Sequence, residues 1–370
     1  MAGSPVSSDT KRTFYGIQTL RGAAACLVVG FHVAYNLRND NNPAWLPVPY
    51  FGNGGVDLFF LISGFVMVWT IKDRWREKGA WTEFLRRRMA RIFPLYWLVT
   101  SVKVAGLLLV PFLLKEPIVS TWNVIASYLL IPSWYSYGEA HPVISAGWTL
   151  CFEMFFYYLC AACLIGRTKP AIAITPIFVA LAIIGCFRTP TWGAVATLLD
   201  PLLLEFVAGM WVAELVRRGW RGPGLRATVL LLAVGCVGLV ASDALPTARE
   251  YQLRVIVWGL PSLAILLSFV ALESRLDFKS LRILLLIGDA SYSIYLTHVI
   301  ALQPLIGILR RQPFGVVGEW CALVIAMCVG VLLGVIVYYF VERPLLRAFS
   351  GTPRVVRSVP AYPPVPSQGF

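Results

Sequence analysis

Two ionisable side chains interrupt the first membrane-length apolar segment, which reads LRGAAACLVVGFHVAY from Leu20 to Tyr35. Arg21 lies near its start, and His32 follows eleven residues later. Eleven residues of α-helix make three turns plus about 20°, so both side chains share one face, roughly 16 Å apart along the axis. Because such groups are expensive in a membrane helix, they usually face a bundle interior or a watery cavity. The spacing therefore predicts a lined channel that holds a cation and a titratable imidazole.

Further polar candidates lie in or next to the later apolar segments. Asp57 falls in the first turn of a helix, where it is either stabilised by the helix N-terminus or placed to contact a substrate. Glu153 lies among aromatic residues in GWTLCFEMFFYYL, and Tyr295 and His298 share a helix face in SYSIYLTH. Counting from helix ends places both carboxylates and His298 in the outer half, at the depth of His32. An imidazole with a carboxylate partner is a reasonable general base for an attacking hydroxyl.

The most basic part of the chain precedes the third apolar segment and contains RRRMARIFPLYW. Arg88 and Arg91 are three residues apart and are therefore neighbours on a helix surface. Arginine forks match phosphate groups in geometry. A positive anchor against anionic lipid headgroups is the alternative, which the residues alone slightly favour.

The composition is that of an all-α polytopic membrane protein. Hydrophobic residues make up 58% of the chain and charged residues 14%, against roughly 25% charged in soluble domains. The length leaves room for about ten helices of about 20 residues. The expected spans are 17–37, 54–71, 92–113, 146–165, 171–187, 198–216, 227–242, 253–272, 283–309 and 316–341. We expect a polar cytoplasmic lead over 1–13, one membrane domain over 14–349, and a disordered Pro-rich tail over 350–370.

The distribution of charge explains the net charge of +13 without a nucleic-acid partner. Most of the 32 lysines and arginines fall in alternate gaps between the expected spans. This is the positive-inside rule, and it predicts that both termini are cytoplasmic. We therefore expect a multi-pass protein of the cell inner (cytoplasmic) membrane, in contact with the lipid bilayer, and the oligomeric state stays open. No metal site is predicted, because the three histidines never come within helix-face spacing of one another.

Three functions fit these residues. The first is a transferase that moves an activated group outward, with its anionic head held inside and its reactive end presented outside. The second is a proton-coupled transporter of a polar or anionic solute, because intramembrane carboxylates and histidines also mark pumps. Such transporters often show inverted repeats, and no internal symmetry is visible in this sequence. The third is a structural membrane protein, which several ionisable groups at one depth disfavour.

The chain resembles the acyltransferase 3 family of membrane O-acyltransferases over nearly all of 14–349, and looks closest to the exopolysaccharide O-acetylases. The shared features are FYGIQTLRG and GGVDLFFLISGF, the Arg-x10-His pair, the Arg-x-x-Arg pair, and the blocks GWTLCFEMFFYYL, SYSIYLTH and VERPL. Thr149 and Cys151 depart from the family's Trp-Ser-Leu-x-x-Glu block. The two spaced pairs and the three blocks, five matches in order, make the resemblance specific.

The resemblance implies transfer of an acyl group, expected to be acetyl, from cytoplasmic acyl-CoA to a hydroxyl of a carbohydrate at the outer face. The acceptor would be a polysaccharide or a lipid-linked oligosaccharide. His32 would be the catalytic base and Arg21 its essential companion. Arg88 and Arg91 would contact the phosphates of coenzyme A. Glu153 is a candidate partner or acceptor-side residue, and no SGNH-type hydrolase domain is expected.

Overall fold

The computed structural model describes residues 14–38, 47–109, 119–136, 139–189, 191–245, 253–310, 312 and 315–350. The predicted lead over 1–13 and the predicted tail beyond Ser350 lie outside these residues. The α-helices are α1 (Tyr15–Leu37), α2 (Gly54–Ile71), α3 (Ala80–Leu109), α5 (Thr121–Leu129), α6 (Gly147–Ile165), α7 (Pro170–Gly185), α8 (Leu203–Arg217), α9 (Leu225–Ala241), α10 (Leu260–Leu272), α11 (Arg282–Asp289), α12 (Ser291–Leu309), α13 (Val316–Val337) and α14 (Arg343–Ser350).

Short elements complete the described part of the chain. The 3₁₀ turns are η1 (Tyr50–Asn53), η2 (Arg74–Arg76), η3 (Ala194–Leu199), η4 (Ser242–Ala244) and η7 (Phe278–Ser280), and the π-helical turns are η6 (Val255–Gly259) and η8 (Tyr338–Glu342). Two short antiparallel strands, β1 (Trp134–Ser136) and β2 (Glu139–Ala140), form a small hairpin. The predicted all-α class is therefore confirmed.

Eight helices among the described residues are long and apolar enough to cross a membrane. They are Tyr15–Leu37, Tyr50–Ile71, Ala80–Leu109, Gly147–Ile165, Leu225–Ala244, Val255–Leu272, Ser291–Leu309 and Val316–Phe349. The other two expected spans, 171–187 and 198–216, coincide with α7 and α8, which have only 16 and 15 residues. A multi-pass membrane fold is thus supported, and the number ten stays a prediction.

Three helix boundaries differ from those expected. The third helix begins at Ala80 rather than at residue 92, so the arginine-rich segment is itself helical. The expected span 283–309 is divided at Ala290 into α11 and α12. The last span continues beyond 341 into α14, past Pro344. Proline clashes with the carbonyl four residues before it, and the wider π-helical turn of η8 accommodates this clash.

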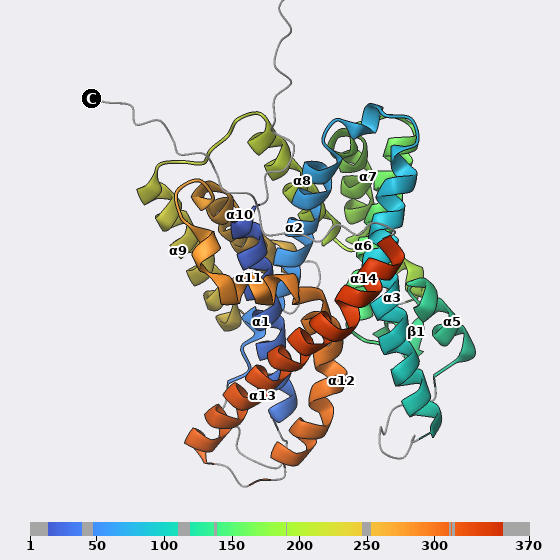
Figure 1. Ribbon diagram of the computed structural model, residues 1–370, viewed down its shortest axis with the longest axis vertical. Helices are drawn as coiled ribbons and strands as arrows, with labels where there is room; N and C mark the ends of the chain where they lie inside the picture. Colours follow the sequence, from blue (N-terminus) through green and yellow to red (C-terminus); the bar gives the residue numbers. More distant parts are fainter. Residues whose placement is uncertain are drawn as a thin grey trace, which may run out of the picture.

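Helix α1 forms the centre of the bundle and contacts α2, α11, α12 and α13 (Figure 1). Between helices in lipid, packing rather than water exclusion drives association, so small residues at the contacts matter. A Cβ atom added to Gly55 of α2 would lie 2.5 Å from the carbonyl oxygen of Ala24 in α1. The two helices therefore approach closely enough to fix the side chains that project from the other faces of α1.

A compact apolar cluster joins α1 to α12 and α13. Its buried members include Val29 and Val33 from α1, Ile294 and Leu302 from α12, and Ala326 from α13. This cluster sets the spacing between α1 and α12, the two helices that carry the histidines named in the sequence analysis.

Candidate active site

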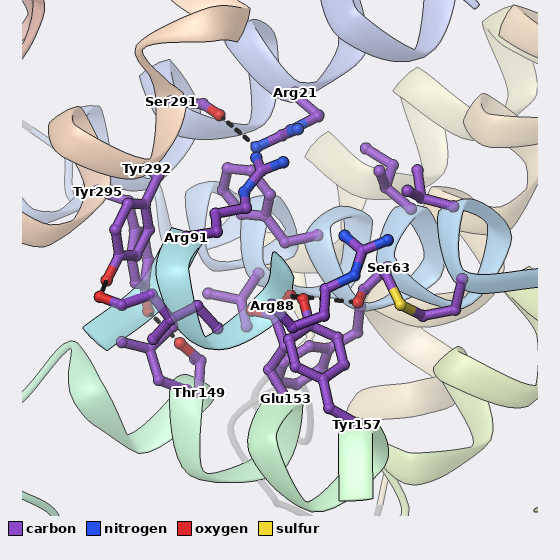
Figure 2. A pocket seen from close by; sticks show the side chains of 18 residues that line it. Arg21, Ser63, Arg88, Arg91, Thr149, Glu153, Tyr157, Ser291, Tyr292 and Tyr295 are labelled. Atoms are coloured by element: carbon purple, nitrogen blue, oxygen red, sulfur yellow. Dashed lines mark hydrogen bonds between the residues drawn. The ribbon is translucent and has the colours of Figure 1, made fainter. Parts of the chain in front are cut away.

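A cavity of about 90 Å³ with both apolar and polar walls lies between α1, α2, α3, α6 and α12, and we call it the arginine cavity (Figure 2). Figure 2 shows that side chains from these separate helices converge on it. Its polar lining residues are Arg21, Ser63, Arg88, Arg91, Thr149, Glu153, Tyr157, Ser291, Tyr292 and Tyr295. Three of these carry guanidinium groups and one carries a carboxylate. The cavity is therefore suited to an anion.

Arg21 of α1 reaches across to α12, where its Nη2 donates a hydrogen bond of 3.1 Å to the hydroxyl oxygen of Ser291 (Figure 2). The sequence grouped Arg21 with His32 on one face of a helix. The structure places Arg21 with Arg88 and Arg91 instead, because the same face of α1 passes two different cavities along its length.

Arg88 is held by aromatic rings and one hydroxyl. Its guanidinium carbon lies 5.6 Å from the ring centroids of both Phe84 and Tyr157, and its Nη2 donates to Thr70 Oγ1 at 3.0 Å. Its Nε is buried and has no hydrogen-bond partner among the described residues. Since a buried donor without a partner is costly, this nitrogen points to a ligand that accepts from it.

Arg91 lies one turn further along α3 and lines the same cavity. Within the described part of the chain, its guanidinium makes no hydrogen bond and no ion pair. Arg88 and Arg91 thus share a helix surface, as their spacing predicted, and both point into a cavity rather than toward lipid headgroups. This placement supports the phosphate-binding interpretation over the anchor interpretation.

Glu153 of α6 lines the arginine cavity as well. It accepts a hydrogen bond from Ser63 Oγ at 3.3 Å and another from the Tyr157 hydroxyl. The expectation that Glu153 lies at the depth of the histidines is therefore wrong. Counting residues from a helix end ignored the packing of α6 against α3, which brings the carboxylate beside the arginines. A catalytic role for Glu153 stays a prediction.

A second cavity of about 230 Å³ lies between α1 and α12, and we call it the histidine cavity. Its lining residues are His32, Asn36, His298, Val299, Leu302, Gln303, Ile306, Gly307 and Arg310. Amide and guanidinium groups there can donate hydrogen bonds, and no carboxylate is among these residues. Such a lining is suited to a ligand rich in hydroxyl groups.

His32 and His298 pack ring against ring in this cavity, with their centroids 4.9 Å apart and their planes at 63°. His32 Nδ1 lies 2.9 Å from the carbonyl oxygen of Val28. Because a carbonyl oxygen only accepts, Nδ1 carries the hydrogen and Nε2 keeps the lone pair that a general base needs. The sequence did not predict this contact, since it compared the histidines only along single helices.

Asp57 lies outside the lining of both cavities and forms a buried ion pair with Arg254. Their closest contact, Arg254 Nη2 to Asp57 Oδ2, is 2.8 Å, and the guanidinium carbon lies 4.8 Å from the Trp258 ring centroid. The predicted contact of Asp57 with a substrate is not favoured by this arrangement. The sequence did contain an indication of this ion pair. Arg254 falls inside an expected span, and an arginine there usually pairs with a carboxylate or a backbone carbonyl.

Tyr295 of α12 lies where the two cavities approach each other. It lines the arginine cavity, and its ring centroid is 6.1 Å from that of His298. Its hydroxyl is 2.9 Å from Thr149 Oγ1 and donates to the carbonyl oxygen of Ala146 at 3.2 Å. Tyr295 and His298, which share a helix face as predicted, therefore line adjacent cavities, and contact of either residue with a substrate stays a prediction.

Sequence reasoning missed several cavity residues. Asn36 is four residues after His32 and so lies on the same helix face, which was a usable signal. Gln303 and Arg310 approach His32 only because α12 packs against α1, and no local sequence pattern indicated this.

No metal site is found among the described residues. No group of three or more histidine, cysteine or carboxylate side chains there could hold a metal ion.

Comparison with known proteins identifies the fold family. A family model for an acyltransferase domain matches residues 14–339, which is most of the chain. The chain belongs to the acyltransferase 3 family. It is therefore an O-acyltransferase, and the resemblance described from its motifs is confirmed. Both cavities lie within the matched residues.

The chain is also similar to three curated relatives. The enzyme is 36% identical over 301 residues to the exopolysaccharide production protein ExoZ of Rhizobium meliloti (strain 1021), covering 80% of this chain and 90% of ExoZ. It is 29% identical to the acyltransferase MdmB of Streptomyces mycarofaciens, covering 92% of this chain and 93% of MdmB. It is 25% identical to nodulation protein 10 of Rhizobium leguminosarum bv. viciae, covering 89% and 92%. No solved structure matches this chain.

Proposed function

We propose that this acyltransferase moves an acyl group, expected to be acetyl, from cytoplasmic acyl-CoA to a hydroxyl of a cell-surface or exopolysaccharide sugar. His32 is the general base of the proposed reaction. The observation that carries the proposal is the pair of cavities along one helix, one rich in arginine and the other lined by His32. The name of one relative, an exopolysaccharide production protein, supports a carbohydrate acceptor.

The arginine cavity is the proposed donor site. Coenzyme A carries several phosphate groups, and arginine forks bind phosphate in a bidentate manner. Arg88 and Arg91 come from successive turns of α3, and Arg21 faces them from α1. Arg88 Nε still lacks a partner among the described residues, which a phosphate oxygen would supply. These contacts support donor binding through the phosphates.

The histidine cavity is the proposed acceptor site. A hydroxyl that gives its proton to His32 Nε2 must enter the cavity that His32 lines. Asn36 and Gln303 offer amide groups that can donate to and accept from sugar hydroxyls. Eleven residues of α1 separate Arg21 from His32, or roughly 16 Å along the axis. The extended arm of the donor therefore has to carry the thioester past Tyr295 to His32.

The proposed chemistry needs only one base. His32 Nε2 takes the proton of the acceptor hydroxyl while the hydroxyl oxygen bonds to the thioester carbonyl carbon. When the tetrahedral intermediate collapses, the carbon–sulfur bond breaks and the proton passes to the sulfur of coenzyme A. The products are an O-acyl sugar and free coenzyme A.

The membrane arrangement is proposed from the charge distribution. With both termini cytoplasmic and ten spans, the segments rich in lysine and arginine face the cytoplasm. Arg88 and Arg91, near the start of α3, then lie toward the cytoplasmic donor, and the histidine cavity lies toward the outer acceptor. The expected location is the inner membrane. Family membership makes the chain an acyltransferase, so the transporter hypothesis is not carried further.

The test is acetyl transfer by the purified full-length chain. The protein is supplied with radiolabelled acetyl-CoA and with oligosaccharides from chemically de-O-acetylated exopolysaccharide. Alkali-labile label on the oligosaccharide from the wild-type protein, formed at least about a hundredfold more slowly with His32→Ala, is the expected result. Acetyl-CoA that binds without any transfer to a hydroxyl compound would refute the proposed acceptor class. Donor that does not bind to the folded protein would refute acyl-CoA as the donor.

A further inference from the structure

The ring of His298 is a titratable neighbour of the proposed base. His298 is fully buried, and its ring packs against that of His32 at a centroid distance of 4.9 Å. The chain has only three histidines, and two of them meet here across α1 and α12. Because helix packing alone brings them together, the contact is a property of the folded cavity and not of a local motif.

Backbone carbonyls fix both imidazoles in the same tautomer. His298 Nδ1 lies 2.7 Å from the Tyr295 carbonyl oxygen and 3.2 Å from that of Ile294, and His32 Nδ1 binds the Val28 carbonyl. Carbonyl oxygens only accept, so each Nδ1 carries a hydrogen and each Nε2 carries a lone pair. The Nε2 atoms of His32 and His298 are therefore both hydrogen-bond acceptors in one cavity. A single added proton could be shared by the two nitrogens.

The second nitrogen of His298 is without a partner. Among the described residues, its Nε2 is buried and makes no hydrogen bond. A buried acceptor with no donor is costly, and an apolar side chain at this position, beside Leu302 in the same cavity, would avoid that cost. The unpartnered nitrogen is therefore not explained by packing.

Among the residues that the structure describes, no carboxylate contacts the ring of His32, the place that acidic residues often have beside a catalytic histidine. Glu153 is engaged by Ser63 and Tyr157 in the arginine cavity, and Asp57 is paired with Arg254. Within the described ranges, the ring contacts of His32 are with Phe31 and His298. The imidazolium that forms during the reaction therefore has His298 as its available acceptor.

We propose that His298 is the proton-sharing partner of His32: its Nε2 accepts a hydrogen bond from the protonated His32 ring while the acceptor oxygen attacks the thioester. The inference rests on the proposed function and concerns the same cavity. His298 is a positioning residue, since it acts through His32 and not on the substrate. The lone pair of His298 Nε2 is the group that acts on His32.

The proton is accounted for at each stage. The acceptor O–H bond breaks as the N–H bond forms on His32 Nε2, and this new N–H is shared between the acceptor oxygen and His298 Nε2 as a three-centre hydrogen bond. No bond to His298 forms or breaks in the reaction. The proton then leaves His32 for the sulfur of coenzyme A as the carbon–sulfur bond breaks, and both rings return to the neutral tautomer. The hydrogen bond to His298 stabilises the positive charge on His32, which exists only during the reaction. The contact therefore lowers the activation barrier and does not tighten substrate binding in the ground state.

Two substitutions of similar size separate this role from packing. His298→Gln keeps an acceptor oxygen near the position of Nε2, while His298→Met fills the space without an acceptor. The control is Ile308→Ala on α12, whose side chain is 60% exposed and lines neither cavity. All variants are assayed as monodisperse full-length protein with acetyl-CoA and de-O-acetylated exopolysaccharide oligosaccharides.

The proposal predicts that His298→Met lowers kcat about a hundredfold and that His298→Gln recovers about tenfold of this loss, within the range of proton-transfer effects. The KM values for both substrates stay within about twofold, and Ile308→Ala behaves as wild type. Adding His298→Met to His32→Ala causes no further loss, because residues that act as a unit are not additive.

Several results would overturn the inference. They are equal kcat values for the Gln and Met variants, a loss confined to KM, or a further loss in the double variant. If His298→Met does not fold, His298→Gln is compared with His298→Asn, whose shorter side chain places no acceptor at the Nε2 position, and equal kcat values again contradict the proposal. Failure of the wild-type protein to transfer acetyl at all refutes the proposed function instead.

Discussion

Arg21 and His32 leave the same face of α1, yet each lines a different cavity. Arg21 reaches Ser291 in the arginine cavity, and His32 packs against His298 in the histidine cavity. Their spacing of roughly 16 Å along the helix axis is therefore the distance between two sites and not the width of one. The sequence predicted one lined channel, and the structure has two cavities instead. Tyr295 lines the arginine cavity and lies near His298 of the histidine cavity.

This separation predicts that His32→Ala leaves donor binding intact while it removes catalysis. The rate of acetyl transfer should fall about a hundredfold to ten-thousandfold, the usual contribution of a general base. The Kd for acetyl-CoA, measured by isothermal titration calorimetry, should stay within about twofold of wild type. Loss of both properties together would mean that the two cavities are not independent.

The donor assignment predicts weaker binding in the double variant Arg88→Ala/Arg91→Ala. A hydrogen bond to a charged group contributes about 1.5–3 kcal/mol, so the Kd for acetyl-CoA should rise at least tenfold. The matched control is Arg87→Ala, because Arg87 is exposed on the same helix and pairs with Glu83. An unchanged Kd in the double variant would return Arg88 and Arg91 to the lipid-anchor interpretation.

Arg88→Lys tests the geometry of that site separately from its charge. A lysine cannot present the planar fork and does not stack in the same way between Phe84 and Tyr157. We expect the Kd for acetyl-CoA to rise although the charge is kept. A Kd equal to that of wild type would show that Arg88 acts only through its charge.

Glu153→Gln distinguishes two roles for this carboxylate. Glu153 is the only carboxylate among the lining residues of the arginine cavity, so its removal should tighten the binding of an anionic donor. The amide still accepts from Ser63 and Tyr157, and stability should change little. A Kd that is lowered severalfold supports an electrostatic role. An unchanged Kd with a large loss of kcat would instead support the catalytic role predicted from the sequence.

The buried pair of Asp57 and Arg254 predicts a loss of stability rather than of substrate affinity. Removal of one partner from a buried ion pair costs about 3–5 kcal/mol. Arg254→Gln should therefore lower the midpoint of thermal unfolding in detergent, and Asp57→Asn in the same chain should restore part of it. The KM values of the protein that remains folded should not move. A selective rise in KM for the acceptor would restore Asp57 as a substrate contact.

Local patterns predicted much of this molecule. The apolar segments gave the helices, the three-residue spacing placed Arg88 and Arg91 on one surface, and the motif order gave the family that the domain match confirms. The side chain of Asn36 was also within reach of a pattern argument, because it follows His32 by one helical turn.

Contacts between helices were beyond such patterns. Depth counted along one helix placed Glu153 with the histidines, while the packing of α6 against α3 placed it with the arginines. The meeting of His32 and His298 depends on the apolar cluster between α1 and α12. Sequence spacing describes a single helix, and these relationships arise only when helices pack.

The proposed enzyme binds an acyl donor in the arginine cavity and transfers its acyl group at His32. The most direct measurement is single-turnover transfer from radiolabelled acetyl-CoA to de-O-acetylated exopolysaccharide oligosaccharides by wild-type and His32→Ala protein, both first saturated with donor. We predict labelled oligosaccharide from the wild type, and bound but untransferred donor on His32→Ala. Transfer by His32→Ala at the wild-type rate would contradict the account.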